Sequence, residues 1–184
     1  MPFYTSRPQE EVNVFQIRKA TPADAMDITL VNVYTWKTTY TGLMPDEIID
    51  RRIRNIVPAA KRIKQQLEQQ PNHFVALVED CVVGYCMTGP TRNQQYPQAG
   101  EIGALYVLQG VQGMGVGKAL YEAAVQELRQ QGYTSMTANC LRGNPVLGFY
   151  QHMGGSIVGE KIELHQGATL VEDVIYFELS SDKT

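Results

Sequence analysis

The sequence predicts a single α/β domain built on a mixed β-sheet. The expected strands and helices follow one another in the order β-α-α-β-β-β-α-β-α-β-β, in which the helical segments 46–56 and 58–69 count as one element. This order combines antiparallel neighbours with parallel strands joined through helices. The chain of 184 residues is within the range of one domain, and no repeat, linker or low-complexity run divides it. Its 43% hydrophobic and 19% charged residues are ordinary for a globular protein.

The pattern of apolar, capping and turn-forming residues predicts where each element lies. Strands are expected at 14–18, 73–79, 82–88, 101–107, 134–139, 156–164 and 170–179, and helices at 22–36, 46–56, 58–69, 116–129 and 145–153.

A loose tail and a capped helix are expected at the start of the chain. Residues 1–13 are polar, contain two prolines and show no periodicity, so we expect the domain to span 14–184. Thr21 suits the N-cap of the first helix, and Pro22 suits its first position. The aromatic segment 36–45, which follows this helix, is expected to be a loop.

Two more helices and a hairpin follow. Pro58 is expected to break or to start a helix, and it separates the two helices that follow the aromatic segment. Asp80-Cys81 lies between two apolar runs and predicts a tight hairpin connection. Segment 89–100 contains two prolines and several polar residues, which is typical of an exposed loop.

The central unit of the chain is a strand, a glycine-rich turn and a helix between residues 101 and 129. From Val116 onward the apolar residues recur at the spacing of one helical face. The turn before this helix contains Gly110, Gly113, Gly115 and Gly117. A glycine-rich turn at a helix N-terminus presents unpaired N–H groups and the positive end of the helix dipole. The unit therefore predicts a phosphate-binding site.

The residues of this turn exclude two common phosphate-binding motifs and fit a third. A P-loop requires Ser or Thr after Gly117-Lys118, where this chain has Ala119. A dinucleotide fingerprint that begins at Gly113 requires a glycine at the position of Lys118. The run from Gln112 to Gly117, QGMGVG, instead resembles the Gln/Arg-x-x-Gly-x-Gly/Ala signature of the GCN5-related N-acetyltransferase (GNAT) family, which holds the pyrophosphate of coenzyme A.

A second segment, 144–155, resembles the other half of the cofactor site in the same family. Asn144 suits a helix N-cap, Pro145 the first helical position and Gly154 the C-terminal cap. Phe149 and Tyr150 follow Asn144 by five and six residues, as in the family. A short capped helix with two core aromatics is the alternative reading, and for Tyr150 the order and spacing of the two segments favour function.

The resemblance covers roughly residues 15–179 and is strongest over 101–155. It implies the GNAT fold, a mixed sheet with helices on both faces and a central strand–glycine loop–helix site for acyl-coenzyme A. It also implies acetyl-coenzyme A as co-substrate, with no metal. The residues that would bind it are Leu105, Tyr106, Val107, Gln112, Gly113, Met114, Gly115, Val116, Gly117, Lys118, Asn144 and Tyr150.

The activity implied is direct transfer of an acetyl group from acetyl-coenzyme A to a primary amine, with Tyr150 and Glu101 as the catalytic residues. A phenol has a pKa of about 10 and a thiol a pKa of about 8.5, so full proton transfer from Tyr150 to the leaving thiolate is unfavourable in free energy. A hydrogen bond from Tyr150 to the leaving sulfur is enough. An ordinary glutamate with a pKa near ~4.3 is poorly matched to an ammonium group near ~10.4. Glu101 as base would therefore need burial or a water chain. A salt-bridging or solvated glutamate is the alternative.

The acceptor pocket is the least determined part of the sequence. Trp36 and Tyr40 stand in a segment that borders the acceptor pocket in one subgroup of the family, and they could equally cover the edge of the core. A small-molecule or peptide amine is the expected acceptor. The net charge of −3 mildly disfavours acidic acceptors and gives no basic footprint for nucleic acid or membrane lipid.

Composition also bears on location and assembly. No apolar run approaches the length of a membrane span, and the N-terminus lacks a signal-peptide pattern, so a cytoplasmic protein is expected. The three cysteines contain no Cys-x-x-Cys pair, and the three histidines are too dispersed for a metal-site motif. The family resemblance allows a homodimer through the C-terminal strands.

Two other classes of protein remain open at this point. Every motif residue would also serve a domain that binds acyl-coenzyme A without turnover, as a sensor. A structural domain without a ligand is the third reading.

Overall fold

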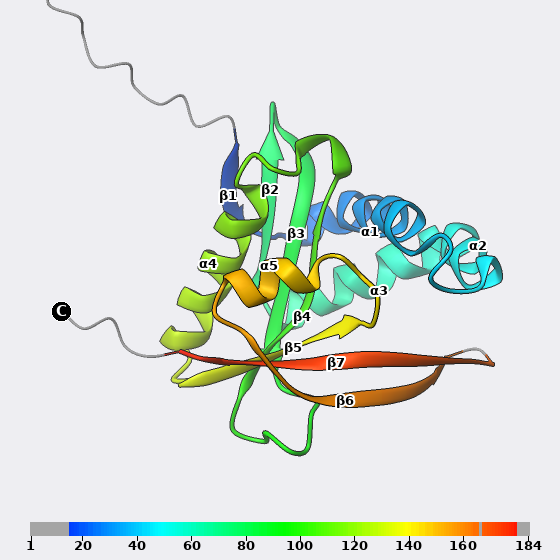
Figure 1. Ribbon diagram of the computed structural model, residues 1–184. Coiled ribbons are helices and arrows are strands. Elements are labelled where there is room, and N and C mark those ends of the chain that lie inside the picture. The colour runs from blue at the N-terminus through cyan, green and yellow to red at the C-terminus, as the bar shows by residue number, and fades with distance from the viewer. Residues whose placement is uncertain (1–14, 166, 180–184) are drawn as a thin grey trace, which may run out of the picture.

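Seven strands form one sheet in the computed structural model, which describes residues 15–165 and 167–179 (Figure 1). Its spatial order is β1-β2-β3-β4-β5-β7-β6. Only β4 and β5 run parallel, and every other neighbouring pair is antiparallel, so the mixed sheet is confirmed. The strands are β1 (Gln16–Lys19), β2 (His73–Val78), β3 (Cys81–Pro90), β4 (Gly100–Val107), β5 (Ser135–Leu141), β6 (Ser156–His165) and β7 (Ala168–Glu178).

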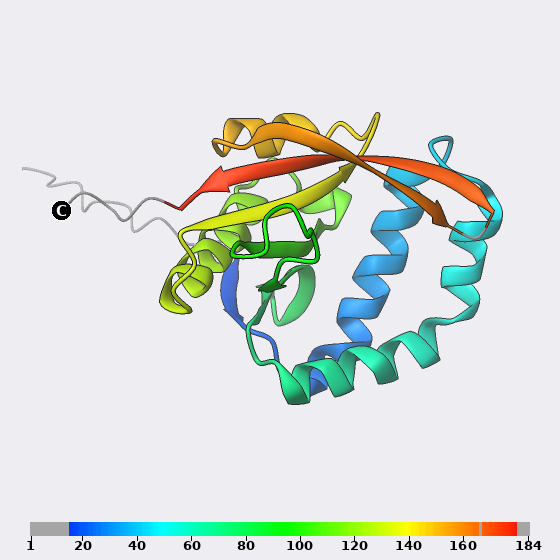
Figure 2. The same ribbon diagram turned by 90° about the horizontal axis from the view of Figure 1, so that it is seen from below.

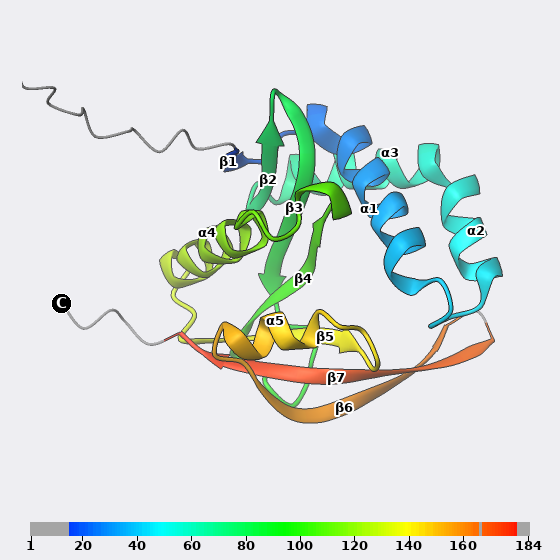
Figure 3. The same cartoon turned by 45° about the horizontal axis from the view of Figure 1, so that its top comes forward.

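The helices lie on both faces of this sheet, as expected. Figures 2 and 3 show α1, α2 and α3 together on one side of β2–β4, with α4 on the other side. The α-helices are α1 (Ala25–Tyr40), α2 (Asp46–Arg54), α3 (Ile56–Gln69), α4 (Val116–Gln130) and α5 (Leu147–His152). Two 3-10 turns, η1 (Pro22–Asp24) and η2 (Gln109–Val111), precede α1 and α4.

Strand β2 shows why two helical layers form. Phe74 and Ala76 belong to the core cluster that includes α4, whereas Val75 and Leu77 belong to the cluster that includes α1 and α3. Successive side chains of a strand point to opposite faces, so a strand apolar at every position needs cover on both sides. The continuous apolar run FVALV, residues 74–78, therefore encodes a sheet buried between helices.

The parallel pair β4–β5 is short, and this shortness opens the sheet. The pairing extends from Gly100 opposite Met136 to Ile102 opposite Ala138. Immediately after Ile102, the β3–β4 register shifts, which leaves Gly103 as an extra residue in β4. Such a bulge bends and twists its strand. Beyond it, β4 continues along β3 while β5 follows β7, so the edges of β4 and β5 that face each other separate.

The boundary between the second and third helices lies at Asn55, because Ile56, expected to end one helix, begins α3, and Pro58 lies in the first turn of α3. Three other predicted boundaries also need correction. Residues 37–40, expected to be loop, continue helix α1, because no Gly or Pro interrupts the chain before Gly42, whose φ is 83°. The hairpin turn is Glu79-Asp80, whose φ values of 48° and 64° suit a tight two-residue connection, and Cys81 already belongs to β3.

The third correction concerns the start of α5 at Leu147, because residues 145 and 146 form a preceding turn. The Oδ1 atom of Asn144 accepts a hydrogen bond from the N–H of Val146 at 3.0 Å, so the predicted capping side chain holds this turn.

The predicted tail, 1–13, and residue Val14 lie outside the described residues, and the first strand begins at Gln16. Among the helices of the described part of the chain, none has the length and apolar character that crossing a membrane would require.

Candidate active site

The glycine-rich turn before α4 leaves a row of backbone N–H groups free. Gly113 and Gly115 have φ values of 80° and 84°, a conformation that side chains with a Cβ atom rarely adopt. Within the described part of the chain, the N–H groups of residues 113–118 donate to no protein acceptor. They lie at the N-terminus of a helix of 15 residues, whose dipole favours an anion at this end.

Two hydrogen bonds hold the turn at the end of β4. The side-chain Nε2 of Gln112 donates to the carbonyl oxygen of Val107 at 3.0 Å, and the N–H of Leu108 donates to the carbonyl oxygen of Val83 at 2.8 Å. The signature glutamine therefore fixes the turn to the strand.

A cavity of about 700 Å³ lies between β4, this turn and α5, and we call it the glycine-loop cavity. It brings together most of the predicted cofactor residues, namely Leu105, Tyr106, Val107, Gln112, Gly113, Gly115, Gly117, Lys118, Asn144 and Tyr150. Met114 is 44% exposed and Val116 is in the core, and neither lines the cavity, so any contribution of these two would come from their backbone. The Lys118 side chain is exposed, with its Nζ 3.7 Å from Oε1 of Glu122 one turn along α4.

Helix α5 supplies Tyr150 to this cavity. Tyr150 is 5% exposed, and its ring packs edge-on against Phe149 and Phe177 at centroid distances of 5.5 and 6.1 Å. Burial raises the pKa of its hydroxyl above the ordinary tyrosine value, so the group stays protonated at neutral pH. At the start of the same segment, Nδ2 of Asn144 donates to the hydroxyl of Tyr40 at 3.5 Å, which links α5 to the end of α1.

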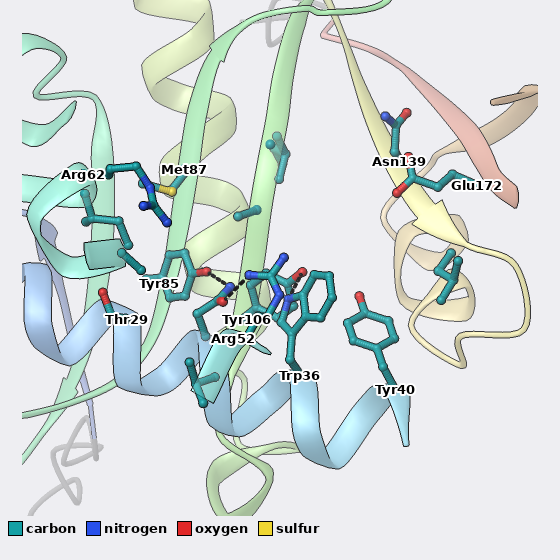
Figure 4. Close-up of a pocket in the computed structure, with 18 of the residues that line it drawn as sticks. Thr29, Trp36, Tyr40, Arg52, Arg62, Tyr85, Met87, Tyr106, Asn139 and Glu172 are labelled. Carbon is teal, nitrogen blue, oxygen red and sulfur yellow. Dashed lines mark hydrogen bonds between the residues drawn. The ribbon is translucent and has the colours of Figure 1, made fainter. Parts of the chain in front are cut away.

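A second cavity, of about 840 Å³, lies between α1–α3 and the strands β4, β5 and β7, and we call it the helix-side cavity (Figure 4). The two cavities share the residues at the β4–β5 separation, namely Tyr40, Ile102, Gly103, Ala104, Tyr106 and Asn139. A molecule in one cavity can therefore meet a molecule in the other at the point where the sheet opens.

The predicted acceptor residues Trp36 and Tyr40 lie on the last turns of α1 and line the helix-side cavity. Their rings meet edge-on at a centroid distance of 4.8 Å. The Nε1 of Trp36 donates to the hydroxyl of Tyr106 at 3.0 Å, which joins α1 to β4. Tyr40 also belongs to a small buried cluster with Met44 and Leu141, so its side chain lines a cavity and covers the edge of the core.

Glu101 also lines the helix-side cavity, but Arg92 binds both oxygens of its carboxylate. Oε1 accepts hydrogen bonds from Nε and Nη2 of Arg92, and Oε2 accepts one from the backbone N–H of the same residue at 2.6 Å. The Glu101 side chain is 4% exposed, while that of Arg92 is 69% exposed. A proton that moved onto this carboxylate would weaken these hydrogen bonds.

The structure adds cavity residues that the sequence reading missed, chiefly Arg52 and Glu172. A signal for Arg52 existed, because it follows Ile48 and Ile49 at helical spacing and is thus a charge on the apolar face of α2. Glu172 is partly buried on β7, and burial, together with the charge of nearby Glu163, raises the pKa of its carboxyl group. Asn139 and Glu172 project from the strand side of the cavity in Figure 4.

Comparison with known proteins agrees with this geometry. Residues 34–154, more than half of the chain, match the model of the acetyltransferase (GNAT) family. The N-acetyltransferase YuaI of Bacillus subtilis is 29% identical over 147 residues, which cover 78% of this chain and 82% of YuaI.

Two solved structures share the fold. The PaiA N-acetyltransferase from Thermoplasma acidophilum, solved with coenzyme A, superposes with a TM-score of 0.67 at 19% identity, over 89% of this chain and 98% of its own. The structure of yncA from Salmonella typhimurium with its cofactor acetyl-CoA gives a TM-score of 0.67 at 20% identity, over 93% and 97%.

The family match takes in the end of α1, the opened β4–β5 pair, the glycine-rich turn and α5, which line the glycine-loop cavity and part of the helix-side cavity. The resemblance that the two sequence motifs suggested is therefore confirmed, and the chain belongs to the GNAT family of acetyltransferases.

Proposed function

We propose that this protein transfers the acetyl group of acetyl-coenzyme A directly to the primary amine of a small molecule or peptide. The observation that carries the proposal is the junction of two cavities at the β4–β5 separation, one with a free phosphate-binding turn and one walled by polar side chains. The structural neighbours solved with coenzyme A and acetyl-CoA support the assignment of the first cavity to the cofactor.

The glycine-loop cavity suits the parts of acetyl-coenzyme A. The N–H groups of 113–118 would hold the diphosphate, through charge-assisted hydrogen bonds worth roughly 1.5–3 kcal/mol each before desolvation. The pantetheine arm would lie along Leu105, Tyr106 and Val107, whose edge beyond Ile102 has no partner in β5. A backbone N–H of this edge would then polarise the thioester carbonyl.

In the reaction, the amine nitrogen attacks the thioester carbon, the C–S bond breaks, and the sulfur leaves as a thiolate. Tyr150 keeps its proton because burial raises its pKa, so its hydroxyl is available to donate a hydrogen bond to this sulfur. The products are the acetylated amine and coenzyme A with a free thiol.

The proton released by the amine needs an acceptor, and three carboxylates line the helix-side cavity, namely Glu101, Glu163 and Glu172. Glu163 forms an ion pair with Lys161. Glu101 is engaged by Arg92 through both oxygens. Glu172 has a raised pKa, which brings it closer to the task of a general base, and within the described residues no hydrogen bond engages its side chain. Glu172 is therefore a second candidate for the role that the sequence assigned to Glu101.

The test is thiol release from acetyl-coenzyme A across a panel of primary amines, read with a thiol-reactive dye. Acceptor-dependent release supports the transferase. Thermal stabilisation by acetyl-coenzyme A with no release for any amine would instead favour the binding domain that does not turn the cofactor over.

Location and assembly remain proposals as well. All three cysteines are free thiols, two of them buried, which suits a reducing cytoplasm. Edge strand β6 exposes Ile162 and Leu164, 64% and 78% accessible, so a homodimer through this strand would cover apolar surface. Light scattering of the purified protein and of Leu164→Lys tests it, because a monomer in both would end the proposal.

A further inference from the structure

The helical wall of the helix-side cavity carries positive charge without a matching negative charge. Arg51, Arg52 and Arg62 line this wall from α2 and α3. Within the part of the chain that the structure describes, none of the three has a carboxylate at ion-pair distance. Other arginines of the molecule, such as Arg92, are paired.

Arg52 is the partly buried member of this group and is held firmly in place. Its guanidinium carbon lies 3.2 Å from the centroid of the Trp36 ring, and its Nη1 donates to Oδ1 of Asn32 at 2.9 Å. Asn32 in turn donates through Nδ2 to the hydroxyl of Tyr85 at 2.7 Å. Figure 4 shows the Arg52 guanidinium among Tyr85, Tyr106 and Trp36. Because several elements fix this side chain, its orientation is set before any ligand arrives.

The guanidinium nevertheless lacks a full set of partners. Its Nε is buried and makes no hydrogen bond. Burial lowers the pKa of Arg52 from the ordinary arginine value, which reports the unfavourable desolvation of a cation. A buried positive charge without a counter-ion is costly and is commonly compensated by an anion. The Trp36 face compensates it only in part.

We infer that the acceptor is a small amine that also bears an anionic oxygen group, which Arg52 binds with the help of Arg62. This inference rests on the proposed acetyl transfer. The planar guanidinium suits a carboxylate or a phosphate group, and both belong to the chemistry that arginine recognises by paired hydrogen bonds. With its anionic end at the helical wall, the acceptor would point its amine across the cavity toward the β4–β5 separation and Glu172 (Figure 4).

The acceptors for the test come in matched pairs. Amino acids are compared with their carboxamides, and ethanolamine phosphate is compared with ethanolamine, so the two arms separate carboxylate from phosphate recognition. For each acceptor, kcat and KM are measured by thiol release with the wild-type protein, Arg52→Gln, Arg52→Lys and Arg62→Gln. Arg54→Gln is the control, because Arg54 is exposed on the same helix and does not line the cavity.

We expect the wild-type protein to prefer the anionic member of at least one pair. Arg52→Gln should raise KM for that acceptor about 10- to 100-fold, the range of one lost charge-assisted contact, with KM for its neutral partner changed less than about twofold. Arg62→Gln should have a smaller effect in the same direction, and Arg54→Gln none. The two amines of a pair differ in basicity, and this difference affects wild type and variant alike. The change in selectivity between wild type and variant is therefore independent of it.

Three results separate the outcomes. A selectivity ratio that Arg52→Gln leaves unchanged, or a wild-type preference for neutral amines, overturns the inference while acetyl transfer stands. No thiol release with any amine overturns the proposed function itself. Where Arg52→Gln does not fold, as judged by thermal unfolding, Arg52→Lys and the exposed Arg62→Gln decide the question, and unchanged selectivity in both overturns the inference.

Discussion

Ile102 of β4 lies opposite Ala138 of β5, and this is the last pair before the two strands separate. The next residue of each strand, Gly103 on β4 and Asn139 on β5, lines both cavities. The end of a three-pair parallel ladder therefore sets the position of the candidate active site. The bulge at Gly103 occurs at the same level, and both features turn backbone groups away from the sheet and toward the cavities.

The glycine-rich turn is tested by Gly115→Asp, which should lower the affinity for coenzyme A at least about 10-fold. A carboxylate here would repel the diphosphate, and the φ of 84° would strain any residue with a Cβ atom. Isothermal calorimetry measures the affinity.

Gly110→Ala and Gly115→Ala make the same chemical change at two positions of this turn, and Gly110→Ala is the control. Gly110 has open space around it and an ordinary φ, so its substitution should leave coenzyme A binding unaltered. Gly115→Ala should weaken binding only through backbone strain. Equal affinity in wild type and Gly115→Asp would refute the assignment of this turn to the diphosphate.

Tyr150→Phe should slow turnover by about 10²- to 10³-fold, the usual range for the loss of an acid catalyst. The ring packing against Phe149 and Phe177 remains in the variant, so KM for acetyl-coenzyme A should change little. Tyr121→Phe is the matched control, because Tyr121 is also buried beside Phe177 but does not line the glycine-loop cavity. A kcat of Tyr150→Phe equal to that of Tyr121→Phe would remove Tyr150 from the mechanism.

The pH profile of kcat distinguishes the two candidate bases. A base must be ionised to accept a proton, so activity falls as pH decreases through its pKa. The raised pKa of Glu172 places this fall above the range of an ordinary glutamate. If Glu172 is the base, Glu172→Gln lowers kcat and removes this part of the profile, while Glu101→Gln keeps it. The opposite pattern would return the role to Glu101.

Acid stability should depend on the ion pair of Asp24 with Arg18 at the start of α1. Two hydrogen bonds from Arg18, with further ones from Thr21, lower the pKa of Asp24 to about 2. As the pH falls, Asp24 is protonated in the unfolded chain before it is protonated in the folded protein. The stabilisation is therefore complete above about pH 4 and is lost as the pH falls toward 2.

Asp24→Asn should cost about 1–2 kcal/mol of unfolding free energy at neutral pH, a figure reduced for solvent screening because the Arg18 side chain is 35% exposed. Urea unfolding at pH 7 and pH 3 measures it. Asp27→Asn is the control and should change stability by less than about 0.5 kcal/mol, because Asp27 is exposed in the first turn of α1 and forms no ion pair with any residue that the structure describes. Equal stability of the two variants at pH 7 would contradict the role of Asp24.

Local patterns predicted most of the fold. The apolar spacing after Val116 gave α4 to within one residue, and the glycines of the turn identified the free N–H groups, because both depend on neighbours along the chain. The end of α1 was placed too early, since aromatic and threonine residues resemble a loop, although no Gly or Pro interrupts the chain before Gly42. Packing of Tyr40 in the cluster with Leu141 supports this last turn of the helix. The hairpin turn was misplaced by one residue for the same kind of reason, because Glu and Asp rarely adopt positive φ without a strand register that requires it.

The sequence by itself determined the family, the sheet class and the glycine-rich turn with its free N–H groups, because each depends on residues that are adjacent or a few turns apart. Only the tertiary structure decided which charged groups line the helix-side cavity. It engaged Glu101 with Arg92, placed Glu172 beside the cavity, and set unpaired arginines on one wall despite a net charge of −3. Net charge sums the whole surface, whereas a ligand experiences the few charges within a Debye length of its site, and no local pattern encodes which these are.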